Sequence, residues 1–242
     1  HASTQMNVES AAGVNLLSKE GIKRVVLARE LGLEEIKAIK AKTNTELEVF
    51  VHGALCVSES GLCLFSSFLG GKSANRGMCT QACRRFYTAE VPGGMEQGYY
   101  FSPCDLQLID RIPDLIEAGV ESFKIEGRMK SAEYVGSVVS AYRYVIDHYQ
   151  ENRKEAVAAA KRMLSTDLAR NKTSYWYNFK SVSEGVDNVA EHILNPNQAG
   201  GTGIYLGKID SLKPGPQDFK MALLKGGSYD PDPGDSIRIR KK

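Results

Sequence analysis

Four cysteines gathered in one short stretch are the residues of this chain best suited to chemistry. They are Cys56, Cys63, Cys79 and Cys83, in the segments VHGALCVSESGLC and RGMCTQACRR. Thiolates bind soft metals, so four of them can complete either a tetrahedral zinc site or an iron–sulfur cluster. The fifth cysteine, Cys104, stands apart in FSPCDL.

The spacing of the four cysteines makes a zinc site less favoured but does not exclude it. The two pairs read C-x6-C and C-x3-C, with fifteen residues between them, and neither is the C-x2-C knuckle of common zinc sites. A disulfide framework fits poorly, because the chain has 242 residues, only five cysteines and no leading signal pattern. The pattern therefore favours a metal centre or cluster over inert or paired thiols.

Polar residues at the ends of three predicted strands are further candidates for chemistry. His52 follows LEVFV, Arg29 and Glu30 end KRVVLARE, and Glu126 and Arg128 end SFKIEGR. Active sites of barrels are built at the carboxyl ends of parallel strands. A carboxylate there can act as an acid or base, and an arginine can grip a carboxylate or phosphate. Internal ion pairing is the alternative role for these charges.

The elements that must position these residues follow from alternating strand and helix patterns. We expect strands at residues 2–8, 23–30, 47–53 and 120–127, and helices at 11–21, 31–43, 102–119 and 131–150. Short connections between such elements predict an α/β fold with βα units and a parallel sheet. Residues 151–170 predict a polar, Ala-rich helix, and glycines and prolines after Asn195 predict a small β appendage.

Composition narrows the functional classes only slightly. With 42% hydrophobic and 25% charged residues, the chain has the make-up of an ordinary globular protein. A net charge of +2 is too small to indicate nucleic-acid binding by itself, although local basic clusters can still contact phosphate. Because no apolar run approaches the roughly 20 residues that span a bilayer, we expect no membrane segment.

Several motifs together resemble the U32 peptidase, or collagenase-like, family. The residues that carry the resemblance are E-x-F-x2-G-A-L-C-x4-G-x-C-x2-S at 48–66, N-R-G-x-C-x-Q-x-C-R at 75–84, F-K-I-E-G-R-M-K-S at 123–131, HASTQMNV at 1–8 and RVVLARE at 24–30. These segments cover most of residues 1–135 and stand in the family's order.

The resemblance implies part of a TIM-like (β/α)8 barrel whose first strands lie before His1. Such a barrel takes about 250 residues. We therefore expect residues 1–150 to form its C-terminal half, with a cysteine-rich insertion at about 52–90, a helical connector at 151–194 and a small β-rich domain at 195–242. The missing half would come from an absent segment or a second family subunit.

Two chemistries are implied by the resemblance. The family's historical label is peptidase, whereas other members are oxygen-independent hydroxylases that carry a [4Fe-4S] cluster. Those hydroxylases modify the wobble uridine of tRNA, a ribosomal RNA cytidine or a quinone precursor, and this chain resembles the RNA-modifying members more closely. Prephenate is the implied oxygen donor, and the implied location is cytoplasmic.

The resemblance also assigns roles to residues of the cysteine region. Cys56, Cys63, Cys79 and Cys83 correspond to the cluster ligands of the family, with Cys104 as an alternative ligand. Arg76, Arg84 and Arg85 flank the second cysteine pair, where they could hold RNA phosphate and tune the potential of the cluster.

Physical reasoning favours the hydroxylase. The sequence contains no HExxH motif, no nucleophile elbow and only four histidines. A peptidase that uses Cys56 and His52 remains an alternative, although their spacing of four residues would require a sharp turn. A zinc-stabilised RNA-binding or partner subunit is a third, non-enzymatic possibility.

Overall fold

The computed structural model describes residues 1–128, 130–165, 167, 169–178, 193–198, 200, 201, 203, 205–215, 220–227, 237 and 239. Its centre is a five-stranded sheet. The strands of that sheet are β1 (Arg24–Val26), β2 (Glu46–Ala54), β5 (Asp105–Gln107), β6 (Ser122–Ile125) and β7 (Lys172–Thr173).

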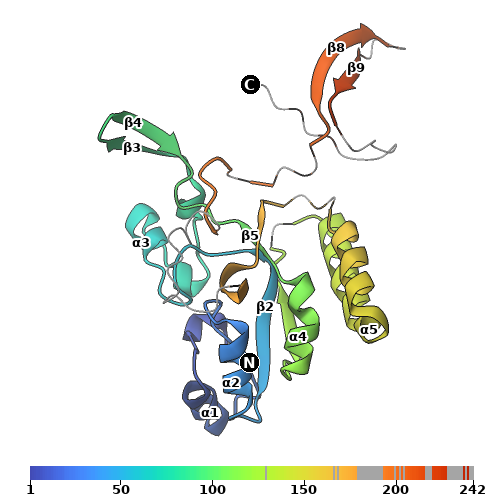
Figure 1. Ribbon diagram of the computed structural model, residues 1–242. Helices are drawn as coiled ribbons and strands as arrows, with labels where there is room; N and C mark the ends of the chain where they lie inside the picture. The colour runs from blue at the N-terminus through green and yellow to red at the C-terminus, as the bar shows by residue number, and fades with distance from the viewer. Residues whose placement is uncertain are drawn as a thin grey trace.

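Strand β2 organises the sheet (Figure 1). It runs parallel to β1 and β6, and its last three residues pair with β5 in the antiparallel direction. Leu47, Val49 and Val51 alternate along β2 and are almost completely buried, as expected for side chains that share one face of a strand. They belong to one core with Ile36 and Leu115, which come from the helices that precede β2 and β6.

Four helices accompany the sheet: α1 (Ala11–Lys19), α2 (Leu33–Lys40), α4 (Ile112–Glu117) and α5 (Ala132–Met163). Helix α2 connects β1 to β2, so these three elements form a βαβ unit with parallel strands. The side-chain hydroxyls of Ser10 and Ser131 accept hydrogen bonds from backbone N–H groups in the first turns of α1 and α5. The expected α/β class is confirmed. Within the described ranges the sheet is open, so the barrel remains a prediction.

Two sequence expectations are wrong. Residues 2–8 do not form a strand: Ala2 makes one isolated bridge to Val25, and Thr4–Met6 form a 3-10 helix. The Ser3 hydroxyl accepts the Gln5 N–H at 3.3 Å, and this local hydrogen bond competes with strand pairing.

The second error concerns residues 102–119, which are not one helix. They form strand β5, a 3-10 turn at Ile109–Arg111 and then the short helix α4. Pro113 stands in the first turn of α4, where a missing N–H has no cost, so the helix begins there instead of earlier.

The two helices expected at 131–150 and 151–170 form one element, α5. It continues to Met163 across a break at Asn152, whose φ of −157° and ψ of 93° are not helical. The Asn152 side chain accepts the Glu155 N–H at 3.1 Å, which is the hydrogen bond of a new helix start. None of the helices in the described part of the chain is both long and apolar enough to cross a membrane.

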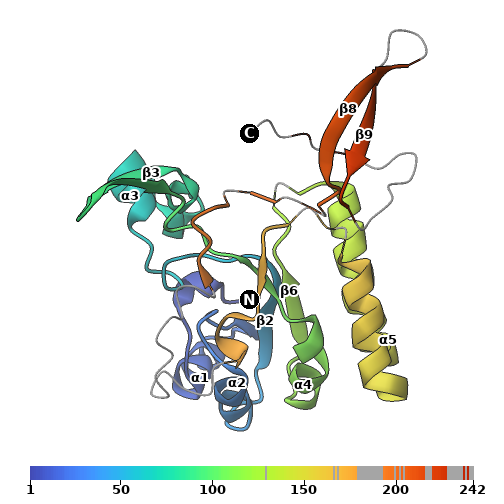
Figure 2. The same ribbon diagram turned by 45° about the horizontal axis from the view of Figure 1, so that its top comes forward.

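Two hairpins lie outside the sheet. Strands β3 (Tyr87–Val91) and β4 (Gly94–Gly98) belong to the cysteine region, and β8 (Lys208–Pro214) pairs with β9 (Lys220–Lys225) in the expected β-rich segment. Both views place the β3–β4 hairpin beside helix α3 (Phe65–Gly70), away from the lower ends of α1 and α2 (Figures 1 and 2). The boundaries proposed for the three parts of the chain remain predictions.

Candidate metal centre

The four clustered cysteines come from loops and short turns that follow β2. Cys56 lies just after β2, Cys63 just before α3, Cys79 between the 3-10 turns Ala74–Arg76 and Ala82–Arg84, and Cys83 within the second turn. All four are free thiols; Cys79 is exposed and the other three are partly buried. Thiols that are free and reachable from solvent can take up a metal.

Electrostatics places the four thiols in one region. Burial raises the pKa of the Cys83 thiol, and the thiols of Cys56, Cys79 and Cys63 raise it further, whereas Arg84 opposes the shift. Such an influence requires the groups to lie close together. Among the described residues, however, no three His, Cys, Asp or Glu side chains converge closely enough to hold one metal ion. The electrostatic effect of three thiols on the fourth supports a common region for the four cysteine segments.

Arg84 links the two cysteine segments through hydrogen bonds within the protein. Its guanidinium donates to the Leu55 carbonyl oxygen at 2.8 Å, to the Ser102 hydroxyl at 2.9 Å and to the Pro103 carbonyl oxygen. Leu55 precedes Cys56, so this one side chain joins the segment of Cys56 to that of Cys83. Burial lowers the pKa of Arg84 to about 10, and the charge of Arg170 adds to the shift.

Arg29 and Glu30 lie in the turn that follows β1, beyond the strand end where they are expected, and hold the loop between Cys56 and Cys63. Ser60 is completely buried in that loop. The Arg29 Nε donates to the Ser60 hydroxyl at 3.2 Å, and Glu30 Oε1 accepts the Ser60 N–H at 2.9 Å. The second Glu30 oxygen, Oε2, is buried without a hydrogen-bond partner in the described structure.

Polar side chains also fix the segments of Cys63 and Cys79. Asn75 Oδ1 accepts the Cys63 N–H at 3.1 Å, and the Ser66 hydroxyl lies 3.9 Å from the Cys79 sulfur. The Gln81 N–H donates to the same sulfur at 3.3 Å. Hydrogen bonds to a sulfur tune the potential of a metal centre wherever that sulfur is a ligand.

Glycine is required where β2 passes β6. Gly53 has a φ of +106°, and a Cβ added there would stand 2.3 Å from the Glu126 carbonyl oxygen. The Glu126 N–H donates to the His52 carbonyl oxygen at 2.8 Å, and Glu126 Oε1 accepts the Arg128 N–H at 3.1 Å. The first of these hydrogen bonds places the backbone of Glu126 beside that of His52.

His52 is 1% exposed, and its ring lies between Tyr142 of α5 and Asp167. Its Nδ1 is 3.2 Å from the Tyr142 hydroxyl, which donates to the Val51 carbonyl oxygen at 2.7 Å. Because that hydroxyl proton is already used, we assign the His52 proton to Nδ1. Burial lowers the pKa of His52, so the ring is neutral near pH 7.

The other ring nitrogen of His52 faces a carboxylate. Nε2 is 3.6 Å from Asp167 Oδ2, beyond hydrogen-bonding distance, and Lys172 Nζ is 2.6 Å from the same oxygen. Both ring nitrogens therefore face groups other than a thiol, which disfavours a peptidase pair of Cys56 and His52. Cys104 is buried, and burial together with Asp105 raises the pKa of its thiol.

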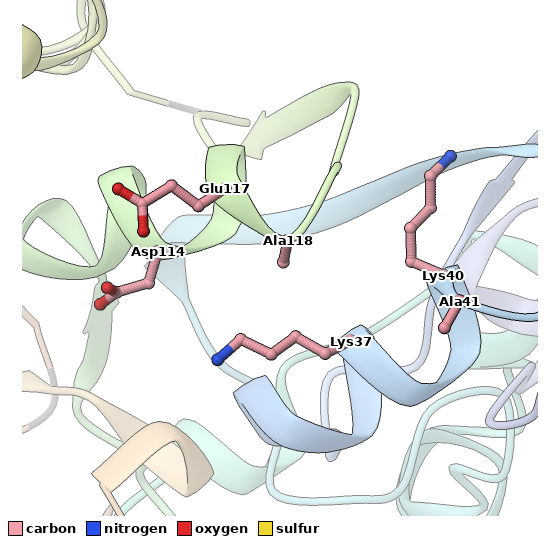
Figure 3. A pocket seen from close by; sticks show the side chains of 6 residues that line it. All are labelled: Lys37, Lys40, Ala41, Asp114, Glu117 and Ala118. Atoms are coloured by element: carbon pink, nitrogen blue, oxygen red, sulfur yellow. The ribbon is translucent and has the colours of Figure 1, made fainter.

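Two cavities lie away from these strand ends. One of about 440 Å³ is lined by Lys37, Lys40, Asp114 and Glu117 of α2 and α4 and contains no predicted site residue (Figure 3). The other, of about 380 Å³, lies against the β3–β4 hairpin.

The structure thus defines an α/β protein that carries a group of thiols in an insertion at the end of its central strand. A family model described as peptidase family U32 matches residues 1–187. The chain therefore belongs to peptidase family U32.

Relatives of this chain are named for different activities. "tRNA hydroxylation protein P1" of Bacillus subtilis (strain 168) is 40% identical over 181 residues, which cover 71% of this chain and 43% of the relative. "23S rRNA 5-hydroxycytidine C2501 synthase" of Escherichia coli (strain K12) is 42% identical over 163 residues, covering 66% of this chain and 25% of the relative. "Collagenase" of Porphyromonas gingivalis (strain ATCC BAA-308 / W83) is 36% identical over 188 residues, which cover 70% of this chain and 45% of the relative.

The chain spans less than half the length of these relatives. No solved structure matches it.

Proposed function

We propose that this protein carries a [4Fe-4S] cluster and hydroxylates a base in RNA without molecular oxygen. The favoured substrate is the wobble uridine of tRNA, with prephenate as the oxygen donor. The observation that carries the proposal is the gathering of four free thiols beside the strand ends. The relatives named for tRNA hydroxylation and for 5-hydroxycytidine synthesis support RNA as the substrate class.

The donor set suits a cluster better than a single zinc ion. Four thiolates around one zinc must all stand about 2.3 Å from the metal, and therefore close to one another. In a cluster each thiolate binds a different iron, so the sulfurs stand farther apart. The pair spacings C-x6-C and C-x3-C are not the C-x2-C knuckle of common zinc sites, and the thiols of Cys56, Cys79 and Cys63 act electrostatically on that of Cys83. This arrangement supports Cys56, Cys63, Cys79 and Cys83 as the cluster ligands.

The cluster, when bound, supplies one-electron chemistry at the strand ends. The chain's own residues would position the reactants there. Glu126 would hold or release a proton, because it stands at the end of β6 beside His52. Arg128 is exposed at the same strand end and would bind the carboxylate of a small co-substrate.

The arginines of the cysteine region would have different roles. Arg76 and Arg85 are exposed and would contact RNA phosphates. Arg84 donates its hydrogen bonds to Leu55, Ser102 and Pro103, so we assign it the positioning of the cysteine segments. Arg29 and Glu30 have a similar positioning role through Ser60.

We further propose that the sheet is half of a (β/α)8 barrel. The parallel order of β1, β2 and β6, with α2 and α4 before the second and third strands, supports this architecture. The other half would come from another segment of the polypeptide or from a second family subunit. The RNA substrate implies a cytoplasmic location.

A collagenase-like peptidase is the alternative function. It is favoured by the relative named collagenase. It is disfavoured by His52, whose two ring nitrogens face Tyr142 and Asp167 instead of a cysteine.

Metal content measured without air tests the cluster. We expect about four irons per chain and the visible charge-transfer absorption of an iron–sulfur protein. Cys83→Ser should lose most of this iron, whereas the control variant Cys104→Ser should keep it. Colourless protein with one zinc per chain would contradict the cluster.

Mass spectrometry of RNA tests the reaction. Incubation of the iron-loaded protein with prephenate and unmodified tRNA, in the absence of oxygen, should add one oxygen atom to the wobble uridine. Gelatin cleavage that persists without iron and disappears in Cys56→Ala would support the peptidase instead.

A further inference from the structure

Three aromatic rings form a cluster directly behind the cysteine segments. The Phe101 ring lies edge-on to the rings of Phe65 and Tyr87, with 5.4 Å between the centroids in each pair, and the Phe65 and Tyr87 rings are stacked at 6.3 Å. Phe65 is two residues beyond Cys63. The Tyr87 hydroxyl donates to the Ala82 carbonyl oxygen at 2.8 Å, immediately before Cys83. The aromatic cluster is therefore fixed to both cysteine pairs.

Two of these rings, Tyr87 and Phe101, form part of a groove. The cavity of about 380 Å³ is lined by Tyr87, Tyr100 and Phe101, together with Ala89, Val91 and Glu96 of the hairpin. Phe101 is 41% exposed, so an aromatic surface is open to solvent there. A groove of this size with aromatic walls and one carboxylate can hold a flat heteroaromatic ring.

The charge around the groove indicates what kind of molecule carries that ring. Residues 72–85 contain four basic residues and no Asp or Glu, and three of the four, Lys72, Arg76 and Arg85, are exposed. This stretch attracts phosphate. Glu96 gives the groove itself a negative group, which repels phosphate and can accept hydrogen bonds from the N–H groups of a base. Phosphates would thus bind the basic stretch at 72–85, and bases would bind the groove.

We infer that the groove between the β3–β4 hairpin and residues Tyr100 and Phe101 binds an unpaired nucleobase of the RNA substrate. The backbone of the RNA lies along the basic stretch at 72–85. This inference rests on the proposed function and adds to it the surface that holds the RNA strand beside the cysteines. Stacking on aromatic side chains is the usual means of holding unpaired bases without strict sequence preference.

Binding of two labelled probes tests the inference. One probe is a short fluorescein-labelled single-stranded oligouridylate, and the other is an abasic ribose-phosphate strand of the same length. Fluorescence anisotropy should show tighter binding of the strand that has bases. Tyr100→Leu and Phe101→Leu retain apolar bulk but remove a ring, so each should raise the Kd of the oligouridylate about 5- to 100-fold. Neither variant should change the Kd of the abasic strand.

Tyr144→Leu is the matched control, because Tyr144 is a half-exposed aromatic residue of α5, outside the groove. It should bind both probes as the unaltered protein does. Cross-linking of 4-thiouridine to the unaltered protein provides a second measurement that does not depend on folding of a variant. The cross-linked peptide should contain residues 87–101.

An unchanged Kd in both groove variants, or cross-links confined to other segments, would overturn the inference. A groove that packs a peptide instead of a base would give the same unchanged Kd. Either result would leave RNA hydroxylation standing if the mass of the tRNA still increases. Base-dependent binding without any hydroxylation would instead support the groove and contradict the proposed function.

Discussion

At the scale of single residues, charged groups of the cysteine region act mainly on the protein itself. Arg84 binds backbone carbonyls on both sides of the insertion, and Arg29 and Glu30 together hold the buried Ser60. Each contact orders a loop that carries a thiol. Charges beside the proposed metal site would thus act by orienting its ligands, without touching the substrate.

His52 makes folding stability depend on pH. Its folded-state pKa is lowered by burial, whereas an unfolded histidine titrates near pH 6.5, so the unfolded chain takes up a proton first as the pH falls. Stability should therefore fall between pH 7.5 and 5.5, by at most about 1.4 kcal/mol per pH unit from this residue. The nearby Asp167, whose own pKa is lowered, stays ionised in this window.

Denaturant unfolding at several pH values measures this effect. His52→Asn should reduce the pH slope of the unfolding free energy. His148→Asn, on an exposed part of α5, is the matched control and should leave the slope unchanged. Equal slopes in the His52 variant and the unaltered protein would show that His52 is not the titrating group.

At the scale of elements, the site depends on how closely β2 and β6 approach each other. Gly53 allows the Glu126 carbonyl to approach the backbone of β2, and the strand register shifts between Phe50 and His52 at the same place. This irregularity lies shortly before the chain leaves the sheet at Ala54 and enters the cysteine insertion. A β-bulge that redirects a strand is common next to functional sites.

Gly53→Ala should therefore destabilise the protein strongly. The new Cβ meets a backbone atom at 2.3 Å, and the φ of +106° is strained for any other residue. We expect a loss of unfolding free energy on the order of 3 kcal/mol, measured by denaturant titration. Gly136→Ala in α5 is the control: nothing lies within 4 Å of its added Cβ, so it should gain up to about 1 kcal/mol. A neutral Gly53 variant would mean that the strands can move apart.

Local patterns predict the elements that form within one βα unit, but not those created by distant pairing. The strand at 47–53 and the helices at 11–21 and 31–43 are confirmed, because periodicity and helix ends encode them, whereas the strand expected at 23–30 is present only at Arg24–Val26. Strand β5 was missed, since Asp105–Gln107 is a strand only through its pairing with β2 and β7.

The same limit applies to the site. The cysteines and the strand-end residues are visible in the sequence by type and position. Their supporting partners are less visible: Ser60 is one serine among many, and Asp167 lies more than a hundred residues after His52 in the sequence. Hydrogen bonds between such distant residues follow from the tertiary structure and leave no local pattern.

At the scale of the whole molecule, charge is nearly balanced. The net charge is only +2, so general attraction to RNA is weak and binding must depend on the local basic stretch. Three exposed basic residues lie in that stretch, at positions 72, 76 and 85.

Salt dependence tests this distribution of charge. If three phosphates are neutralised, the logarithm of the binding constant for single-stranded RNA should fall with the logarithm of salt concentration with a slope of about −2. Arg85→Ala should make the slope shallower by about 0.7, whereas Lys225→Ala in the distant β9 strand should not change it. A slope near zero would contradict phosphate binding by this stretch.

The pairing of β2 with β5 also has a consequence for how such proteins can diversify. Ala54 and Asp105 are direct partners in that pairing, so the chain leaves the sheet and re-enters it at neighbouring points. Everything between them is one closed excursion that contains all four clustered cysteines and the aromatic groove. Doubling the length of such an excursion adds only about 0.6 kcal/mol of closure cost. The excursion can therefore be lengthened, shortened or exchanged for another while the sheet beneath it stays the same, so one scaffold can serve different substrates.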